Sequence, residues 1–208
     1  SLQTLFRSYL RENGIIPEKC DLNSILFLLT PAETLTKMQT LVAQIALFEK
    51  HIKQDSLLKD VLPTVYKNNE DRYKGYTIRQ LCQEMHDFYK SRNVSLLQQR
   101  LFSREYFPDY VMNPQEANFE FQRNKGELVP LSEAEGRIAL EGALPYPPGV
   151  ICVQPGERWS KTACDYFLAL EDGINQLPGF TPEIQGVYIT EQSNGYKQAY
   201  GYVLKKEY

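Results

Sequence analysis

The sequence predicts an α+β fold, with helices and small sheets interspersed along 208 residues. Helical periodicity dominates the first half, where apolar side chains recur every three or four residues. A stiff apolar stretch over residues 140–159 contains four prolines and three glycines, which is typical of a buried, irregular connection between strands. Near the end of the chain, Asn194-Gly195 between β-prone runs predicts a hairpin.

The first elements are predicted from local signals. A helix begins at Leu2 and ends at Asn13-Gly14, a common C-terminal signal. The continuous apolar run at residues 25–29, bounded by a Thr-Pro pair, predicts a buried strand. Residues 18–21 then form a polar turn at a strand end, where functional groups are common.

An amphipathic helix is predicted from Thr34 onward. Its apolar stripe consists of Leu35, Met38, Leu41, Val42, Ile45, Phe48 and Ile52. The composition loosens around Gln54-Asp55, and we place a domain boundary there. The predicted domains are residues 1–56 and residues 57–208.

Capping signals and prolines position the later elements. Thr77 and Gln80 form a capping box that opens a helix, and Asn113-Pro114 starts another. A further helix is predicted over residues 162–176. The predicted strands before the final hairpin are residues 127–130, 137–142 and 150–154.

Composition excludes several classes of partner. The net charge of −3 gives no basic excess for nucleic acid or an anionic membrane, so neither is expected as a partner. No run approaches the ~20 apolar residues of a membrane span. Four scattered cysteines without CxxC spacing fit reduced thiols, and we expect a cytoplasmic location. The abrupt helical start without Met suggests a piece of a longer chain.

The residues offer few groups for catalysis. Gly-rich phosphate loops, zinc spacings and Gly-x-Ser-x-Gly motifs are absent from the sequence. His51 is interpreted as a solvated side chain. Cys82 and His86 have the i,i+4 spacing of two metal ligands, but no further ligands are visible, so packing is favoured and no metal site is expected.

Glu18 and Asp21 are the best paired carboxylates. Three residues apart around a turn, they are able to face one cationic ligand. The alternative is a turn cap plus a surface charge, and the residues by themselves leave both interpretations open.

Several segments, taken together and in collinear order, resemble the bacterial ornithine/lysine/arginine decarboxylases. The segments are Pro-Glu-Lys-Cys-Asp-Leu-Asn within residues 16–31, residues 127–130 and 135–139, Pro-Tyr-Pro-Pro-Gly at 145–149, Pro-Gly-Glu at 155–157 and Leu-Pro-Gly-Phe at 177–180. The first of these looks most like the ornithine branch. The resemblance implies a pyridoxal-phosphate enzyme of the aspartate-aminotransferase fold type, converting L-ornithine to putrescine and CO2 in polyamine biosynthesis or acid response.

The resemblance also implies how the chain is organised. Residues 1–56 would end the small subdomain of the cofactor fold, and residues 57–208 would form the C-terminal α+β domain, with small sheets and a final hairpin. By similarity, Glu18 would bind the distal ammonium of L-ornithine, with Asp21 as the second candidate. A homodimer, and beyond it a ring of dimers, is the expected assembly.

The family's Schiff-base lysine follows a histidine, and this chain contains no His-Lys pair. The cofactor-binding segments precede this region in the family. No catalytic or cofactor-binding residue is therefore expected here, and the isolated chain is predicted to be inactive. Two alternatives stay open: a lysine or arginine decarboxylase of the same family, and a non-catalytic interaction or regulatory module with this fold.

Overall fold

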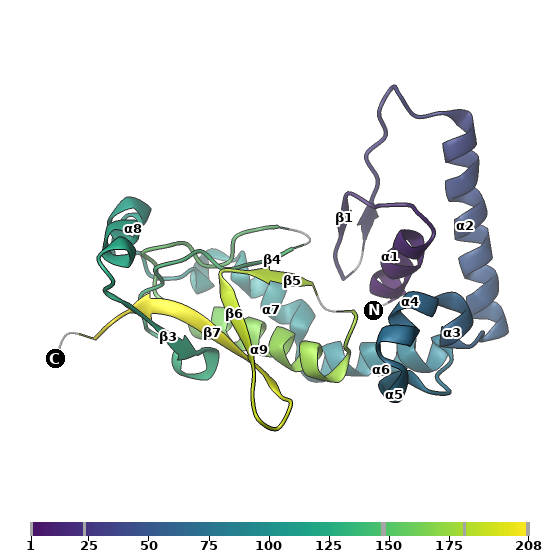
Figure 1. Ribbon diagram of the computed structural model, residues 1–208. Helices are drawn as coiled ribbons and strands as arrows, with labels where there is room; N and C mark the ends of the chain where they lie inside the picture. Colours follow the sequence, from purple (N-terminus) through teal and green to yellow (C-terminus); the bar gives the residue numbers. More distant parts are fainter. Residues whose placement is uncertain (1, 23, 147–148, 181, 207–208) are drawn as a thin grey trace. The chain divides into compact units, whose positions relative to one another are not determined.

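The structure is a computed structural model that describes residues 2–22, 24–146, 149–180 and 182–206 (Figure 1). Helices and small antiparallel sheets alternate along the chain, which confirms the predicted α+β class. The chain forms two compact units. Unit 1 comprises Ser1–Ser91 with Pro178–Phe180, and unit 2 comprises Arg92–Leu177 with Thr181–Tyr208. The sequence-predicted boundary between residues 56 and 57 falls within unit 1, and the two predicted family domains stay a prediction.

Unit 1 is mainly helical. Its elements are α1 (Leu2–Glu12), β1 (Lys19–Cys20), β2 (Ile25–Leu26), α2 (Leu35–Gln54), α3 (Leu58–Val61), α4 (Pro63–Asn68), α5 (Glu70–Tyr73) and α6 (Ile78–Ser91). The capping box that opens α6 is formed as predicted: the Gln80 side chain accepts from the Thr77 amide at 3.0 Å, and the Gln80 amide donates to the Thr77 hydroxyl at 3.3 Å.

The core of unit 1 lies among α1, α3 and α6. Leucine, isoleucine and methionine side chains on one face of each helix are fully buried, namely Leu5, Leu10, Leu58, Ile78, Leu81 and Met85. Helix α2 contributes Phe48, whose ring lies 5.0 Å from that of Tyr9 on α1. Tyr73 is buried as well, and its hydroxyl donates to the carbonyl of Pro178 at 2.9 Å.

The predicted buried strand at residues 25–29 is wrong in this structure. Only Ile25–Leu26 pair as β2, antiparallel to β1, and residues 27–29 lie outside any strand. Leu28 and Leu29 are exposed. Apart from the pairing of Ile25–Leu26 with β1, the run forms no strand among the described residues of unit 1, and its last two side chains are left in solvent.

Unit 2 combines helices with two sheets. Its elements are α7 (Val94–Leu101), η1 (Arg104–Tyr106), α8 (Pro114–Gln122), β3 (Gly126–Pro130), η2 (Leu131–Glu133), β4 (Leu144–Tyr146), α9 (Lys161–Gln176), β5 (Glu183–Gln185), β6 (Val187–Glu191) and β7 (Lys197–Leu204). Strands β3, β7 and β6 form one antiparallel sheet in that order, and β4 pairs with β5.

The β6–β7 hairpin turns at Asn194-Gly195, as predicted. Gly195 has φ +80°, which the hairpin turn requires and which glycine adopts without strain. Helix α9 packs against α7, β7 and η2, and it buries Tyr166, Phe167 and Leu170 in the core of unit 2. Figure 1 shows α9 and the β6–β7 hairpin in unit 2. The Trp159 ring meets that of Phe167 edge-on at 5.5 Å between centroids. Contacts between segments distant in the sequence thus hold β7, the last strand, against helix α9.

The stretch over residues 140–159 is an irregular connection, as predicted, but it lacks the strands predicted at 137–142 and 150–154. It is only partly buried: Val153 and Trp159 lie in the core, whereas Val150 and Ile151 are exposed. Isolated bridges replace them: Ile138 pairs with Arg158, and Ala143 with Val153. The strand that does form, β4, lies between the two predicted ones and pairs with β5, which was not predicted. Residues 147 and 148 of the Pro-Tyr-Pro-Pro-Gly motif lie outside the described residues.

Across the ranges that the structure describes, no helix combines the length and the apolar character needed to cross a membrane.

Candidate functional site

The acidic turn of unit 1 is held by a short antiparallel ribbon. The Glu18 amide donates to the Leu26 carbonyl at 2.9 Å, and the Asp21 amide donates to the Ser24 carbonyl at 3.0 Å. Between these two bonds, Lys19 pairs with Leu26 and Cys20 with Ile25. The ribbon therefore fixes the backbone on both sides of the two candidate carboxylates.

The Asp21 carboxylate closes the turn. Its Oδ1 accepts from the Ser24 amide at 2.6 Å and its Oδ2 accepts from the Ser24 hydroxyl at 3.0 Å. Short polar side chains stabilise turns by such bonds to backbone groups nearby. Because both oxygens are engaged by Ser24, the geometry gives Asp21 the part of a turn cap.

Glu18 differs from Asp21 in its surroundings. Its side chain is exposed, and within the described residues it has no hydrogen-bond or ion-pair partner. Of the two candidate carboxylates, Asp21 is thus engaged within the turn and Glu18 is not. Glu18 is the one with both oxygens available to a cation.

Beneath the turn, Cys20 ties the ribbon to α1. Its thiol is buried and lies 3.6 Å from the carbonyl oxygen of Gln3, to which it donates. Burial raises the pKa of Cys20, against the opposing influence of the nearby Arg7. The thiol is thus a packed, protonated group that supports the ribbon.

The two histidines do not form a site. The His51 Nδ1 and the Ser56 hydroxyl lie 2.9 Å apart, a local bond at the end of α2. His86 is exposed on α6, and Cys82 one turn earlier is partly buried. No cluster of three or more metal-ligating side chains occurs among the described residues. The favoured interpretation of Cys82 and His86 as packing residues stays a prediction, since Cys82 is partly buried whereas His86 is exposed.

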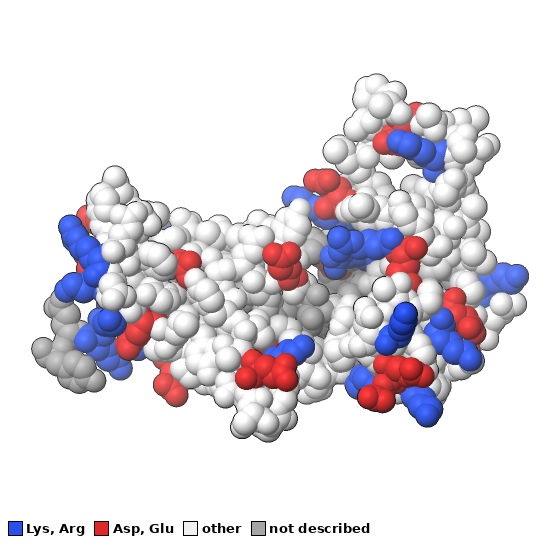
Figure 2. All heavy atoms as spheres, in the orientation of Figure 1, with Lys and Arg blue, Asp and Glu red and all other residues white. Residues whose placement is uncertain are grey.

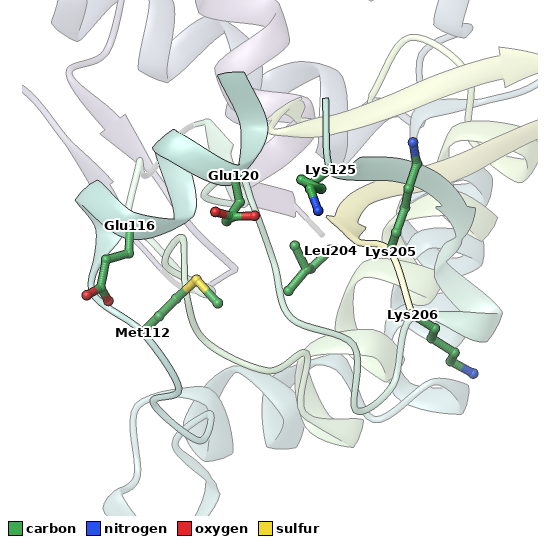
Figure 3. A pocket seen from close by; sticks show the side chains of 7 residues that line it. All are labelled: Met112, Glu116, Glu120, Lys125, Leu204, Lys205 and Lys206. Carbon is green, nitrogen blue, oxygen red and sulfur yellow. The ribbon is translucent and has the colours of Figure 1, made fainter. Parts of the chain in front are cut away.

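Unit 2 contains a cavity of about 510 Å³ that sequence reasoning missed (Figure 3). It is lined by Met112, Glu116, Glu120, Lys125, Leu204, Lys205 and Lys206. Three of the charged side chains that line the cavity already have partners within the protein. Glu116 completes the cap of α8 with Asn113, and Glu120 pairs with Arg123 at 2.9 Å. Lys205 donates to the Asn124 carbonyl. Both signs of charge line the cavity, so a ligand that carries only one sign of charge is not favoured.

Charge is mixed on the surface as well. Figure 2 shows acidic and basic side chains interspersed over the visible face of each unit. Such a distribution provides no strong field for steering a charged macromolecule.

Two family models match the chain. Residues 95–205 match the C-terminal domain of Orn/Lys/Arg decarboxylase, and residues 3–37 match the major domain of the same family. The first match alone covers more than half of the sequence. The chain belongs to the Orn/Lys/Arg decarboxylase family. The resemblance carried by the Pro-Glu-Lys-Cys-Asp-Leu-Asn and Pro-Gly-Glu segments is thereby confirmed.

Individual members of the Orn/Lys/Arg decarboxylase family differ in their similarity to the chain. Ornithine decarboxylase of Haemophilus influenzae is 76% identical over 97% of this chain, and the inducible ornithine decarboxylase of Escherichia coli is 60% identical over 97%. The lysine decarboxylase of Hafnia alvei is 33% identical over 89% of this chain.

The solved structure of lysine decarboxylase A from Pseudomonas aeruginosa superposes with a TM-score of 0.90, at 30% identity and over 98% of this chain. The chain spans 28% of the length of the Haemophilus and Escherichia relatives and 27% of the Pseudomonas chain. The match therefore concerns one part of a decarboxylase of this family.

Proposed function

We propose that this chain is the C-terminal part of a pyridoxal-phosphate-dependent ornithine decarboxylase that converts L-ornithine to putrescine and CO2. The observation that carries the proposal is the gap in similarity within one family. Matched proteins named ornithine decarboxylase are 59–76% identical to the chain, whereas matched proteins named lysine decarboxylase are 28–33% identical. The location is proposed to be cytoplasmic, which the four free cysteines support.

The residues of this chain do not fit the attachment of pyridoxal phosphate. Attachment in the family requires a lysine after a histidine, and here His51 precedes Ile52 and His86 precedes Asp87. The cofactor would be held by the rest of the longer protein, and the chain contributes substrate recognition and structure. The isolated 208-residue chain is accordingly expected to release no CO2 from ornithine, even with the cofactor added.

Glu18 is proposed to bind the distal ammonium of the substrate. An exposed carboxylate that has no partner among the described residues, and that a hydrogen-bonded ribbon holds in place, is suited to accept a cation. A charge-assisted hydrogen bond contributes about 1.5–3 kcal/mol, and more once water is excluded. Asp21, whose oxygens are engaged by Ser24, is proposed to shape the turn and remains the second candidate.

Selection of ornithine over lysine then depends on the depth of the substrate pocket. Lysine is longer by one methylene, and a pocket of fixed length discriminates by about 1–3 kcal/mol per methylene. A carboxylate fixed by the β1–β2 ribbon sets that length. The homodimer, and rings built from it, are proposed as the assembly in which this pocket is completed.

Kinetics on the longer protein test this proposal. Ornithine should exceed lysine and arginine by at least ~10-fold in kcat/KM. Glu18→Gln should raise the ornithine KM by roughly 10–100-fold, which is the factor expected from losing one charge-assisted hydrogen bond to the substrate. The matched control is Glu33→Gln, which removes a carboxylate of unit 1 that pairs with Lys37 at 3.1 Å.

Unchanged kinetics in Glu18→Gln would show that Glu18 is the wrong residue. If the longer protein preferred lysine or arginine as its substrate, the chain would instead be proposed to belong to a decarboxylase of that amino acid. Complete inactivity of the longer protein toward all three amino acids would favour a non-catalytic module.

A further inference from the structure

The cavity of unit 2 lies beside helix α8 and has walls of opposite charge. We call it the α8 cavity, and its volume of about 510 Å³ is within the range of small-molecule sites. Glu116 and Glu120 extend from α8 on one side, and lysines that flank β3 and β7 lie on the other side (Figure 3). Met112 and Leu204 add apolar surface to the lining.

The acidic side of the α8 cavity consists of two carboxylates one helical turn apart. Glu116 and Glu120 are four residues apart on α8, so they share one face of the helix at a rise of about 6 Å. Glu116 Oε2 accepts from the Asn113 amide at 3.0 Å, and Glu120 Oε1 accepts from Arg123 at 2.9 Å. In the described part of the chain, the second oxygen of each carboxylate has no partner and is available to a further N–H donor.

The basic side of the α8 cavity is only partly neutralised. Lys205 donates to the Asn124 carbonyl at 3.1 Å, whereas the Lys125 ammonium has no partner among the described residues. Figure 3 shows Lys125 beside Glu120 and Leu204, with Lys206 directed away from the carboxylates. Within the ranges that the structure describes, no ion pair joins a lysine of the cavity to either glutamate. Opposite charges thus line one space without neutralising each other, and a ligand that carries both charges would neutralise them.

Backbone hydrogen bonds connect the two sides of the α8 cavity. The Lys125 amide donates to the Glu120 carbonyl at 3.0 Å, and the Lys205 amide donates to the Lys125 carbonyl at 2.8 Å. The capping box of α8 holds the Glu116 side chain. The spacing of the charged residues is therefore set before a ligand binds, which lowers the cost of ordering on binding.

The charges of the α8 cavity discriminate between classes of ligand. A phosphate or another anion would be repelled by the two glutamates, and a diamine would be repelled by the lysines. A basic α-amino acid carries one carboxylate for the lysines and two ammonium groups for the two glutamates. Its methylene groups would lie against the apolar part of the lining.

We propose that the α8 cavity binds a basic α-amino acid, with its carboxylate at Lys125 and its ammonium groups at Glu116 and Glu120. The charged side chains are near the surface, so each ion pair contributes little and the expected Kd is millimolar. The proposal rests on the proposed function only in the choice of L-ornithine as the probe. Its tests measure binding in unit 2, so their failure is distinct from a failure of the Glu18 kinetics.

Amide hydrogen exchange on the longer protein is the first test, after borohydride reduction of its Schiff base so that ornithine is not consumed. The probes are L-ornithine, putrescine, which lacks the carboxylate, and δ-aminovalerate, which lacks the α-ammonium group. With L-ornithine at about ten times its Kd, the amides of residues 116–122 and 204–205 should exchange roughly 10-fold more slowly. At the same concentration and ionic strength, putrescine and δ-aminovalerate should slow them by about 3-fold or less. Amides in the core of α9 are the control and should not respond.

Reversal of one charge in the longer protein is the second test. Lys125→Glu replaces the unpartnered ammonium by a third carboxylate, so the cavity should bind L-ornithine about 5-fold more weakly and putrescine about 5-fold more tightly. The matched control is Lys197→Glu, which reverses an exposed lysine of β7 and should leave both Kd values unchanged. Because one Kd rises while the other falls, a loss of folding cannot produce the expected result.

Three results would overturn the proposal. The first is exchange of residues 116–122 that L-ornithine leaves unchanged. The second is equal protection by all three probes, which would show that the carboxylate and the α-ammonium group are not recognised. The third is a Lys125→Glu protein whose two Kd values change in the same direction or match those of Lys197→Glu.

Discussion

The Glu171 carboxylate of α9 accepts a hydrogen bond from the Ala199 amide of β7 at 2.6 Å. Its other oxygen accepts from the Tyr196 hydroxyl at 2.8 Å. Glu171 is only 7% exposed, the one buried charged side chain among the described residues. A buried carboxylate is tolerated when its oxygens are hydrogen-bonded, and here both bonds join the final hairpin to the central helix of unit 2.

Substitution Glu171→Ala should destabilise unit 2 by about 3 kcal/mol, because it removes two charge-assisted bonds and leaves the Ala199 amide buried without an acceptor. Denaturant unfolding followed by the fluorescence of Trp159, the single tryptophan, measures this loss. The control is Asp165→Ala on the same helix, whose side chain is 40% exposed and pairs with Lys161. That substitution should cost less than ~1 kcal/mol. Equal losses in the two variants would contradict the role of Glu171.

Gly156 should tolerate no side chain. It has φ +91°, and a Cβ there would lie 2.1 Å from the carbonyl oxygen of Met112. Gly195 has a similar φ of +80° but open space around it. Gly156→Ala should therefore cost ~3 kcal/mol or more, and Gly195→Ala about 1 kcal/mol, in the same unfolding experiment. A smaller loss at Gly156 than at Gly195 would show that the close approach to Met112 is relieved at little cost.

The Asp21–Ser24 turn should loosen without unfolding unit 1. Asp21→Ala removes both bonds to Ser24, so the Ser24 amide should exchange about 10-fold faster. Because the turn is exposed, the free energy of unfolding should fall by less than ~1.5 kcal/mol. Asp21→Asn retains one side-chain oxygen for the Ser24 amide and should largely preserve its protection. Unchanged exchange in Asp21→Ala would mean that the ribbon alone fixes the turn.

Thiol labelling should distinguish the cysteines. Burial raises the pKa of Cys152 and Cys164 to about 12, and both side chains are buried. The thiolate is the reactive form, so at pH near 8 these two should label slowly. Cys82 is only partly buried and should label first, and Cys82→Ser should remove the fast phase. A fast phase that persists in this variant would point to local opening at one of the buried thiols.

Local signals in the sequence were sufficient for most helices and for the hairpin. The Thr77 and Gln80 capping box, the Asn113-Pro114 start and the Asn194-Gly195 turn each depend on hydrogen bonds within a few residues. The family segments likewise identified the acidic turn, while the residues by themselves left open whether Asp21 caps the turn, as its bonds to Ser24 do here, or faces a ligand.

Pairings between distant segments were not predictable in this way. The partner of β4 is β5, about 40 residues later, and nothing in either three-residue strand specifies the other. Residues 137–142 instead exchange single bonds with different segments: the Ala139 amide donates to the Glu157 carbonyl and the Leu140 amide to the Tyr202 carbonyl. Alternating partners prevent a regular strand there.

The sequence by itself determined the α+β class, the capped helices, the final hairpin and the family. Tertiary structure alone decided how the proline-rich stretch is paired. It also decided that Leu28 and Leu29 of the apolar run and Leu35, Val42 and Ile45 of α2 are exposed. The physical reason is the separation in sequence of the residues that interact. Caps and turns are fixed by residues that are neighbours along the chain. Burial and strand pairing depend on segments that folding brings together from far apart in the chain.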